Sequence, residues 1–244
     1  SGRWVMFSAV EVDLEKNTKV SHLWVAPLGV VPLGVAPLAG GASGQASERQ
    51  VTFWKEGESG GRFSPDGRQV AFVATDTATG LSQIFLAPWD DATGTFGTPK
   101  PLTSVSTGAD GPVWSPDSRR ILFVSRVYPE CSNEESWLEQ NTCNKRREDA
   151  AAASPGKAMV FEHLLYRHWD HYIGDKRSDV LVVSATDGNA VRDLTPRSAI
   201  GDAEAPVFTV DGPTDYAWAP DSHEIAYVAN LDAVPAASTN NDVY

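Results

Sequence analysis

Long apolar runs are missing from this chain. Its most apolar stretch, residues 25–41, is interrupted by three prolines and several glycines. A membrane-spanning helix needs roughly 20 uninterrupted apolar residues, so we expect no membrane span. The first eight residues also lack a basic segment followed by an apolar one, which is the pattern of a signal peptide. We expect that no signal peptide is included in this chain.

Positive charge is also scarce. The 244 residues include 20 Lys and Arg against 32 Asp and Glu, which gives a net charge of −12. Surfaces that bind nucleic acids gather Lys and Arg, whereas the one basic cluster here, residues 145–147, is followed at once by Glu148 and Asp149. We therefore expect that cluster to face solvent and the chain not to bind nucleic acids.

Cysteine is limited to Cys131 and Cys143, twelve positions apart in a polar segment. A disulfide between them would close a short loop and add roughly 2–3 kcal/mol of stability, as suits a periplasmic or secreted protein. The alternative is two separate thiols in a reducing compartment. A zinc site fits less well, because His163 alone does not supply the closely spaced ligand pairs that such sites use.

What the chain does contain is an internal repeat. Residues 63–73, 114–124 and 218–228 read FSPDGRQVAFV, WSPDSRRILFV and WAPDSHEIAYV, and residues 2–8 match the later part of the same motif. Pro-Asp followed by Gly or Ser favours a tight turn, since Pro fixes φ at the first corner and Asp can bond its own backbone. The aromatic residue before this turn and the apolar run after it predict a hairpin. The chain is thus expected to open inside a repeat.

Each hairpin is followed by another apolar run, at residues 21–26, 82–87 and 179–183, and Leu-Thr pairs at 102–103 and 194–195 close two of the units. Four short strands per unit are predicted. Pro65 and Pro116 lie 51 positions apart, which is the size of a propeller blade. Pro116 and Pro220 lie 104 apart with no second motif between them, and we attribute the difference to an insertion at about residues 128–165.

The predicted fold is all-β: a partial β-propeller of about four blades with repeats near residues 1–50, 51–103, 104–196 and 197–244. The insertion is expected to be partly helical, with a helix that starts near Ser154-Pro155. Its apolar stripe is formed by Met159, Val160, His163 and Leu164, which recur at helical spacing. Because an open arc of blades leaves strand edges unpaired, we expect the isolated chain to aggregate or to form an oligomer.

Catalytic patterns are missing. A serine hydrolase of the α/β class needs Gly-x-Ser-x-Gly at a strand-to-helix turn, and neither this pattern nor the alternating strands and helices of that fold occurs. No phosphate-binding loop, EF-hand or His-Glu-x-x-His spacing is present, so we expect no catalytic residue, cofactor or metal in this chain. The repeated aspartates Asp66, Asp117 and Asp221 are interpreted as turn residues.

Residues 164–172 have the most unusual composition, with two histidines, three aromatic residues and an Arg and Asp pair. They favour a recognition surface, where aromatic residues and Arg serve as anchors. The alternative is a strand whose apolar face packs in the blade while Arg167 and Asp170 pair locally.

The Ser-Pro-Asp hairpins resemble those of TolB-type and prolyl oligopeptidase-type propellers. Three combinations are more specific: residues 11–17 followed by residues 21–24, the cysteine-bearing insertion that follows residues 126–129, and residues 166–170 followed by residues 174–178. Together they are similar to bacterial dipeptidyl-peptidase or acylaminoacyl-peptidase relatives in the prolyl oligopeptidase family.

The resemblance implies a partner, the C-terminal α/β-hydrolase domain of the same protein, which this chain lacks. It implies that the propeller restricts entry to short peptides and binds their amino terminus through a carboxylate. The candidate substrate-binding residues lie in and after the insertion: Glu134, Glu135, Glu162, Arg167, His168 and Asp170. The alternative function is a stand-alone, TolB-like periplasmic propeller that acts through protein contacts.

Overall fold

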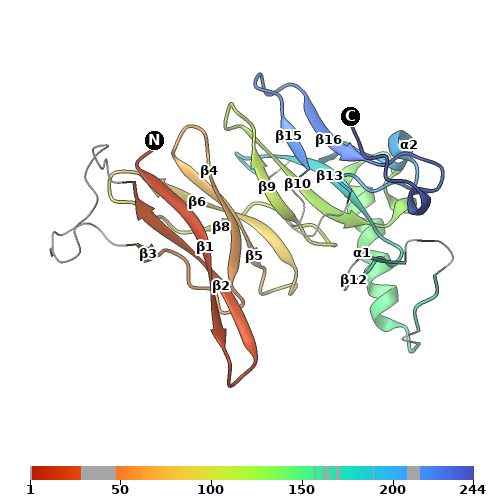
Figure 1. Ribbon diagram of the computed structural model, residues 1–244, viewed down its shortest axis with the longest axis horizontal. Helices are drawn as coiled ribbons and strands as arrows, with labels where there is room; N and C mark the ends of the chain where they lie inside the picture. The colour runs from red at the N-terminus through yellow and green to blue at the C-terminus, as the bar shows by residue number, and fades with distance from the viewer. Residues whose placement is uncertain are drawn as a thin grey trace.

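The structure is a computed structural model that describes residues 2–28, 48–156, 158–161, 164, 166–168, 171–188, 190–207 and 215–244. Four antiparallel sheets of three or more strands follow one another in chain order, from the N-terminal end on the left of Figure 1 to the C-terminal end on the right. This arrangement confirms the predicted all-β fold with about four propeller-like sheets. No helix in the described part of the chain is long and apolar enough to cross a membrane.

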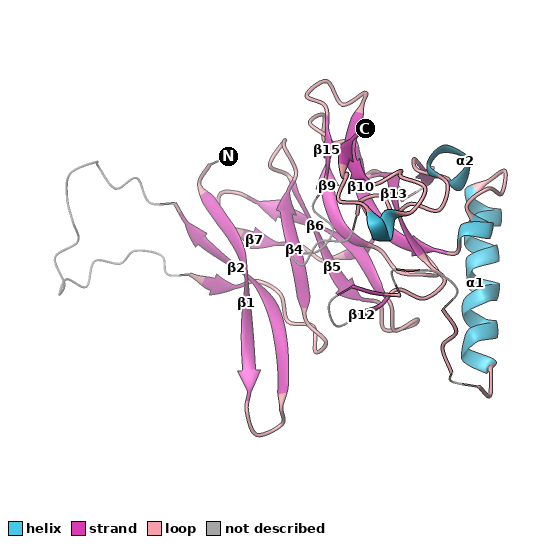
Figure 2. Cartoon of the chain, turned by 45° about the vertical axis from the view of Figure 1, so that its right-hand side comes forward, coloured by secondary structure: helices cyan, strands magenta, loops and turns pink. Residues whose placement is uncertain are grey.

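The first sheet has the strand order β1-β2-β3 and the second has β4-β5-β6-β7, with β8 also paired to β6. Their bounds are β1 Trp4–Asp13, β2 Thr18–Pro27, β3 Arg49–Gln50, β4 Glu58–Phe63, β5 Gln69–Thr75, β6 Ser82–Asp90, β7 Thr95–Phe96 and β8 Lys100–Pro101. The hairpin of β1 and β2 extends well beyond the second sheet (Figure 2).

The third sheet has the order β14-β13-β10-β9 and the fourth has β15-β16-β17. Their bounds are β9 Asp110–Trp114, β10 Arg120–Val127, β13 Arg177–Ser184, β14 Arg192–Asp193, β15 Tyr216–Trp218, β16 Ile225–Ala229 and β17 Asp242–Val243. Short helices α2 (Arg197–Ile200) and η2 (Pro235–Ala237) lie in the connections. The long excursion between β10 and β13 therefore interrupts a hairpin of the third sheet.

The Pro-Asp turns have the conformation that the sequence predicts. The residue after each Asp has a positive φ, of 71° at Gly67, 60° at Ser118 and 67° at Ser222. In all three turns the Asp carboxylate accepts a hydrogen bond from the backbone N–H two residues later. These aspartates are therefore turn residues.

Serine at the left-handed corner has a second role that the sequence did not reveal. Ser118 Oγ accepts a 3.0 Å hydrogen bond from the backbone N–H of Asp66 in the preceding sheet. Ser222 Oγ accepts the corresponding bond from Asp117 at 3.1 Å. Successive turns are thus tied together at the same position of the repeat, which explains why Ser, rather than the less strained Gly, stands there.

The tryptophans before the second and third turns also connect neighbouring sheets. Trp114 Nε1 donates to the carbonyl of Arg62, and Trp218 Nε1 donates to the carbonyl of Val113, each at 3.1 Å. An indole N–H that is buried with a hydrogen-bond partner avoids the cost of an unsatisfied donor. The repeated motif therefore encodes contacts between sheets as well as the hairpin itself.

The inserted segment contains η1 (Pro129–Cys131), helix α1 (Trp137–Ala153) and a two-stranded sheet of β11 (Arg167–His168) and β12 (His171–Tyr172). Helix α1 begins with a capping box, in which Ser136 and Glu139 bond each other's backbone N–H groups. A Ser-x-x-Glu sequence is a recognised helix start, so the start of α1 could have been predicted from the sequence.

The helix expected to start near Ser154-Pro155 was predicted wrongly. Helix α1 ends there, because Ser154 is extended with ψ of 127°, the conformation that a residue before proline prefers. Residues 158–161 are not helical, and Met159, Val160 and Leu164 are exposed rather than packed on one helix face. His163 lies outside the described residues.

Candidate functional site

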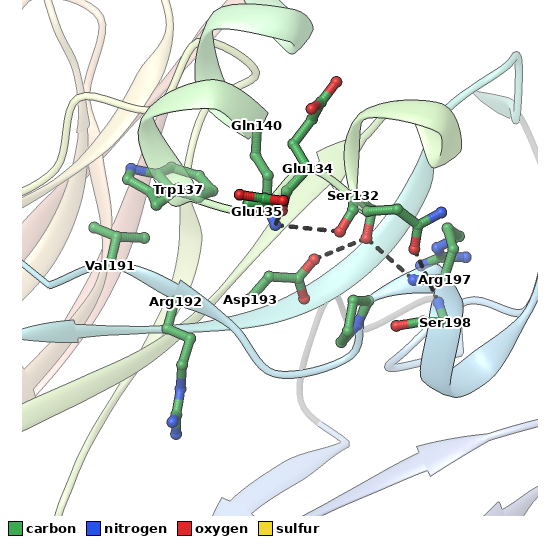
Figure 3. Close-up of a pocket in the computed structure, with 12 residues that line it drawn as sticks. Ser132, Glu134, Glu135, Trp137, Gln140, Val191, Arg192, Asp193, Arg197 and Ser198 are labelled. Atoms are coloured by element: carbon green, nitrogen blue, oxygen red, sulfur yellow. Dashed lines mark hydrogen bonds between the residues drawn. The ribbon is translucent and has the colours of Figure 1, made fainter.

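A pocket of about 540 Å³ lies where the inserted segment meets the third sheet. One wall comes from the segment between η1 and α1 and from the first turn of α1, with Glu134, Glu135 and Trp137. The opposite wall comes from β14 and the start of α2, with Asp193 and Arg197 (Figure 3). The pocket therefore combines chain segments that lie about sixty residues apart in the sequence.

A disulfide holds the first wall in place. Cys131 and Cys143 are bonded, which confirms the predicted pairing, and both are buried beside Tyr128. The backbone N–H of Tyr128 also donates to Asn144 Oδ1 at 2.9 Å. The segment that carries Glu134 and Glu135 is thus fixed at both ends, to η1 and to the second turn of α1.

Helix α1 is also bonded to the loop that follows the second sheet. Ser106 donates its backbone N–H to Asn141 Oδ1 at 2.9 Å and its hydroxyl to the Asn141 carbonyl at 2.9 Å. Asn141 Nδ2 donates to the Ser104 carbonyl at 3.3 Å. The pocket wall is therefore positioned by the disulfide and by a neighbouring blade together.

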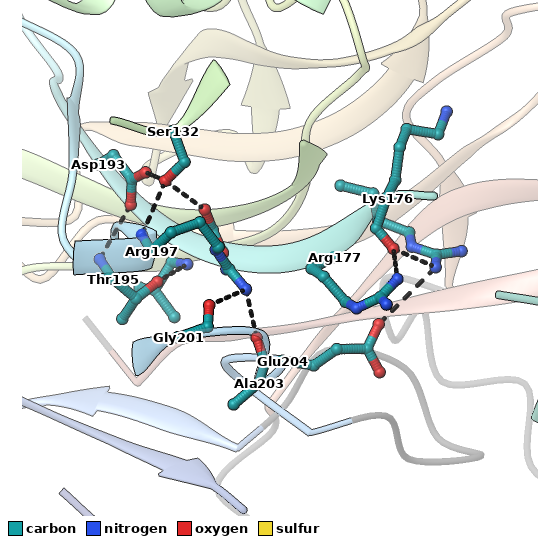
Figure 4. Close-up of polar contacts among 12 residues, drawn as sticks. Ser132, Lys176, Arg177, Asp193, Thr195, Arg197, Gly201, Ala203 and Glu204 are labelled. Carbon is teal, nitrogen blue, oxygen red and sulfur yellow. Dashed lines mark hydrogen bonds and ion pairs between the residues drawn. The ribbon is translucent and has the colours of Figure 1, made fainter. Parts of the chain in front are cut away.

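Ser132 and Asp193 both line the pocket and are bonded to each other where its two walls meet, and we call this part the pocket floor. Its Oγ lies 2.9 Å from Asp193 Oδ2 and 3.3 Å from Asp179 Oδ2, and it accepts a 3.2 Å hydrogen bond from the Arg197 backbone N–H (Figure 4). A hydroxyl has one proton to donate, and the shorter distance favours Asp193. Ser132 thus joins the inserted segment to β13, β14 and α2.

Beneath the floor, Asp179 and Arg197 form an ion pair that is almost completely excluded from water. Burial lowers the pKa of Arg197 to about 10, which leaves the guanidinium charged at neutral pH. Arg197 Nη1 also donates to the carbonyls of Gly201 and Ala203. Ion pairs of this kind fix a unique arrangement, because either partner alone would be an uncompensated buried charge.

Burial raises the pKa of Asp193 to about 6, although its hydrogen bonds from the Thr195 backbone N–H and from Ser132 act in the opposite direction. At pH 7 the carboxylate is mostly ionised. The floor of the pocket therefore carries negative charge at neutral pH and becomes less negative in mild acid.

The raised pKa of Asp193 predicts a specific pH dependence. Because the folded chain binds this proton more tightly than the unfolded chain, stability should fall as pH rises from about 4 to about 6. Asp193→Asn removes this titration. As pH rises from 4 to 7, the free energy of unfolding of the variant should therefore increase relative to that of the wild type by on the order of 2–3 kcal/mol. Urea unfolding of both chains at several pH values measures the difference, and a difference that does not change with pH would contradict the prediction.

No family model matches the chain. The "Uncharacterized peptidase YuxL" of Bacillus subtilis is 26% identical over 195 residues, which cover 78% of this chain and 25% of that protein. The acylaminoacyl peptidase structure of Pyrococcus horikoshii matches with a TM-score of 0.53 and 16% identity, over 93% of this chain and 26% of that one. The chain is a β-propeller segment that resembles those of prolyl oligopeptidase family peptidases.

A third similar structure is the β-propeller domain of the Trilobed protease from Pyrococcus furiosus, with a TM-score of 0.47, 16% identity and coverage of 100% of this chain and 51% of that one. The propeller segment spans about a quarter of the length of the two peptidases named above. At 16% identity and a TM-score of 0.53, the likeness to the acylaminoacyl peptidase structure establishes the fold of the propeller segment and no more.

Of the predicted site residues that it describes, the structure places only two in the pocket. Glu134 and Glu135 lie together in the pocket wall of the propeller segment, both exposed. Arg167 is exposed on β11 and does not line the pocket. His168 is placed only as backbone in β11, whereas Glu162 and Asp170 lie outside the described residues.

Sequence reasoning missed Ser132, Asp193 and Arg197. No sequence signal distinguishes them, because their roles come from contacts between segments about 60 residues apart. Among the residues that the structure describes, no group of His, Cys, Asp and Glu side chains could hold a metal ion.

Within the residues that the structure describes, the hairpin of β11 and β12 forms its own two-stranded sheet and pairs with no strand of a blade. Tyr166 and Tyr172 are exposed, and both rings contact Phe161 at centroid distances of 5.5 and 5.6 Å. The interpretation of this segment as a strand with its apolar face packed in the blade is therefore wrong for both tyrosines.

Proposed function

We propose that this chain is part of the propeller of a serine exopeptidase of the dipeptidyl or acylaminoacyl type. It admits short peptides and orients them for an α/β-hydrolase domain of the same protein. The likeness to peptidase propellers supports the association with a peptidase. The pocket with Glu134 and Glu135 is the observation that supports substrate orientation.

The ligand group that fits this pocket is the ammonium of a peptide amino terminus. Glu134 and Glu135 are exposed carboxylates on a segment fixed by the disulfide, and Asp193 adds negative charge at the floor. Carboxylates bind ammonium groups through charge-assisted hydrogen bonds. Trp137 and Val191 offer apolar surface to the first side chains of the peptide, and the volume lies in the range of small-ligand pockets.

A periplasmic or secreted location belongs to the same proposal. The disulfide between Cys131 and Cys143 supports it, since such bonds persist in oxidising compartments.

Peptide binding tests the proposal directly on this chain. Trialanine with a free amino terminus should bind, and N-acetyl-trialanine should bind at least about tenfold more weakly, because loss of a charge-assisted hydrogen bond costs roughly 1.5–3 kcal/mol. The double variant Glu134→Gln/Glu135→Gln should lose the preference for the free amino terminus. Calorimetric titration or NMR shift mapping measures both effects.

Glu15→Gln is the matched control, since Glu15 is an exposed carboxylate in the turn between β1 and β2, away from the pocket lining. It should leave both affinities unchanged. Equal binding of the free and acetylated peptides, or full retention of the preference in the double variant, would show that these carboxylates do not bind the amino terminus.

A further inference from the structure

The segment of residues 132–136 connects η1 to α1 and carries Glu134 and Glu135 without a helix or strand of its own. Both carboxylates are exposed, so the backbone beneath them decides from where each side chain reaches into the pocket. A binding group that is not held in place binds more weakly, because ordering a loop and its side chains on binding costs free energy. The contacts that fix this backbone therefore determine how well the two carboxylates act together.

Gln140 contacts this segment from the first turn of α1. Its Nε2 donates to the carbonyl of Ser132 at 3.2 Å and to the carbonyl of Glu134 at 3.1 Å. Figure 3 shows the amide extending from the helix toward Ser132. A side-chain amide nitrogen carries two protons, so one glutamine can bond both carbonyls at once. Among the residues that the structure describes, no other group bonds to the Glu134 carbonyl.

Gln140 is itself held in place by its neighbours on α1. Asn141, the next residue, is bonded to Ser106 in the loop that follows the second sheet. The carbonyl of Gln140 accepts a 2.9 Å hydrogen bond from Asn144 Nδ2, and Asn144 Oδ1 accepts the backbone N–H of Tyr128. The glutamine amide therefore projects from a part of the helix that is fixed both to a neighbouring blade and to the start of the insertion.

The other contacts of the segment act before Glu134 or outside the loop. The disulfide joins Cys131 to Cys143 and so closes the two ends of the loop. Asn133 Oδ1 accepts the Ser198 backbone N–H at 3.0 Å. These contacts leave the position of the Glu134 backbone itself to the bond from α1.

We propose that Gln140 is a positioning residue for Glu134 and Glu135. It holds the backbone that carries them in the conformation in which both carboxylates face one peptide ammonium. This inference rests on the proposed function of the pocket, and it assigns to an uncharged side chain the preorganisation that a shared ammonium requires.

Gln140→Met tests the proposal, because it keeps the length of the side chain and removes the donor. The preference for trialanine over N-acetyl-trialanine should fall at least about threefold, since the carboxylates must then be ordered on binding. In the Glu134→Gln/Glu135→Gln background the same change should leave the affinity ratio unaltered, because Gln140 acts through those carboxylates. A merely structural role would weaken both peptides alike in either background. Calorimetric titration measures the four ratios.

Thr142→Ala is the control on the same helix. Its hydroxyl is exposed and donates to the Leu138 carbonyl one turn earlier, outside the pocket lining, so the affinity ratio should stay at the wild-type value. Gln140→Ala removes the same two bonds with the strongest helix former and should reproduce the ratio of Gln140→Met. Circular dichroism shows that each variant is folded.

A measurement without peptide separates this inference from the proposed function. NMR order parameters of the Glu134 and Glu135 amides should fall in Gln140→Met and stay unchanged in Thr142→Ala. If the wild type binds both peptides equally, the proposed function fails, and lower order parameters still support the role of Gln140 in holding the segment. Unchanged order parameters in Gln140→Met overturn the inference. So does an unchanged affinity ratio in that variant when the wild type prefers the free amino terminus.

Discussion

Replacement of Arg197 by Met should lower the free energy of unfolding by about 3–5 kcal/mol. Asp179 is fully buried, and without Arg197 its carboxylate would remain in the interior with no opposite charge. The carbonyls of Gly201 and Ala203 would lose their donor as well. Urea unfolding at pH 7, followed by tryptophan fluorescence, measures the loss.

Replacement of both residues of the buried ion pair tests whether the unpaired charge causes this loss of stability. The double variant Asp179→Asn/Arg197→Met removes both charges, so it should be more stable than Arg197→Met alone, although it loses the same guanidinium. Arg68→Met, at an exposed arginine, should change stability by no more than about 0.5 kcal/mol. If Arg197→Met costs no more than Arg68→Met, the buried pair does not stabilise the fold.

Asp179 illustrates a strand that could be predicted from the sequence and a side-chain role that could not. Residues 179–183 were interpreted as an apolar strand, and β13 is indeed one. At the register position of Asp179, the second sheet has Gln83, and its side chain bonds the loop at Val105 and Thr103. The first sheet has His22 there, paired with the buried Glu58. The second and third sheets thus bury a polar residue at this position that binds the segment leading to the next sheet, whereas His22 binds the next sheet directly. This role becomes visible only when loops and strands are placed together.

The hairpins were predictable because their causes are local. Pro65 sets one backbone angle and Gly67 tolerates another, so a few neighbouring residues define the turn. The pocket was not predictable in the same way, since Ser132 and Asp193 meet only after the insertion folds back on the third sheet. Glu134 and Glu135 were identified as candidates by their place in the insertion, without a motif to select them. Tertiary contacts decided which of the candidate carboxylates share a pocket.

Removal of the disulfide is also expected to lower the free energy of unfolding strongly. Cys131→Ser/Cys143→Ser should reduce the free energy of unfolding by about 3 kcal/mol, because the bond restricts a short loop in the unfolded chain. Denaturant unfolding of the oxidised wild type and of the double variant measures the loss. A reducing agent should destabilise the wild type by a similar amount and leave the variant unchanged, which separates the disulfide from other effects of the reagent.

The same variant tests whether the disulfide shapes the pocket. Without the disulfide, only noncovalent contacts such as the Tyr128–Asn144 hydrogen bond and the 2.9 Å ion pair of Arg147 and Glu130 would hold η1 against α1, so amide hydrogen exchange across residues 128–144 should become faster. Exchange in β10, whose core residues are fully buried, should remain slow because blade packing does not involve the bond. If Glu134 and Glu135 bind a peptide amino terminus, affinity for trialanine should fall together with protection of this segment. Unchanged exchange in 128–144 would mean that packing alone positions the two carboxylates.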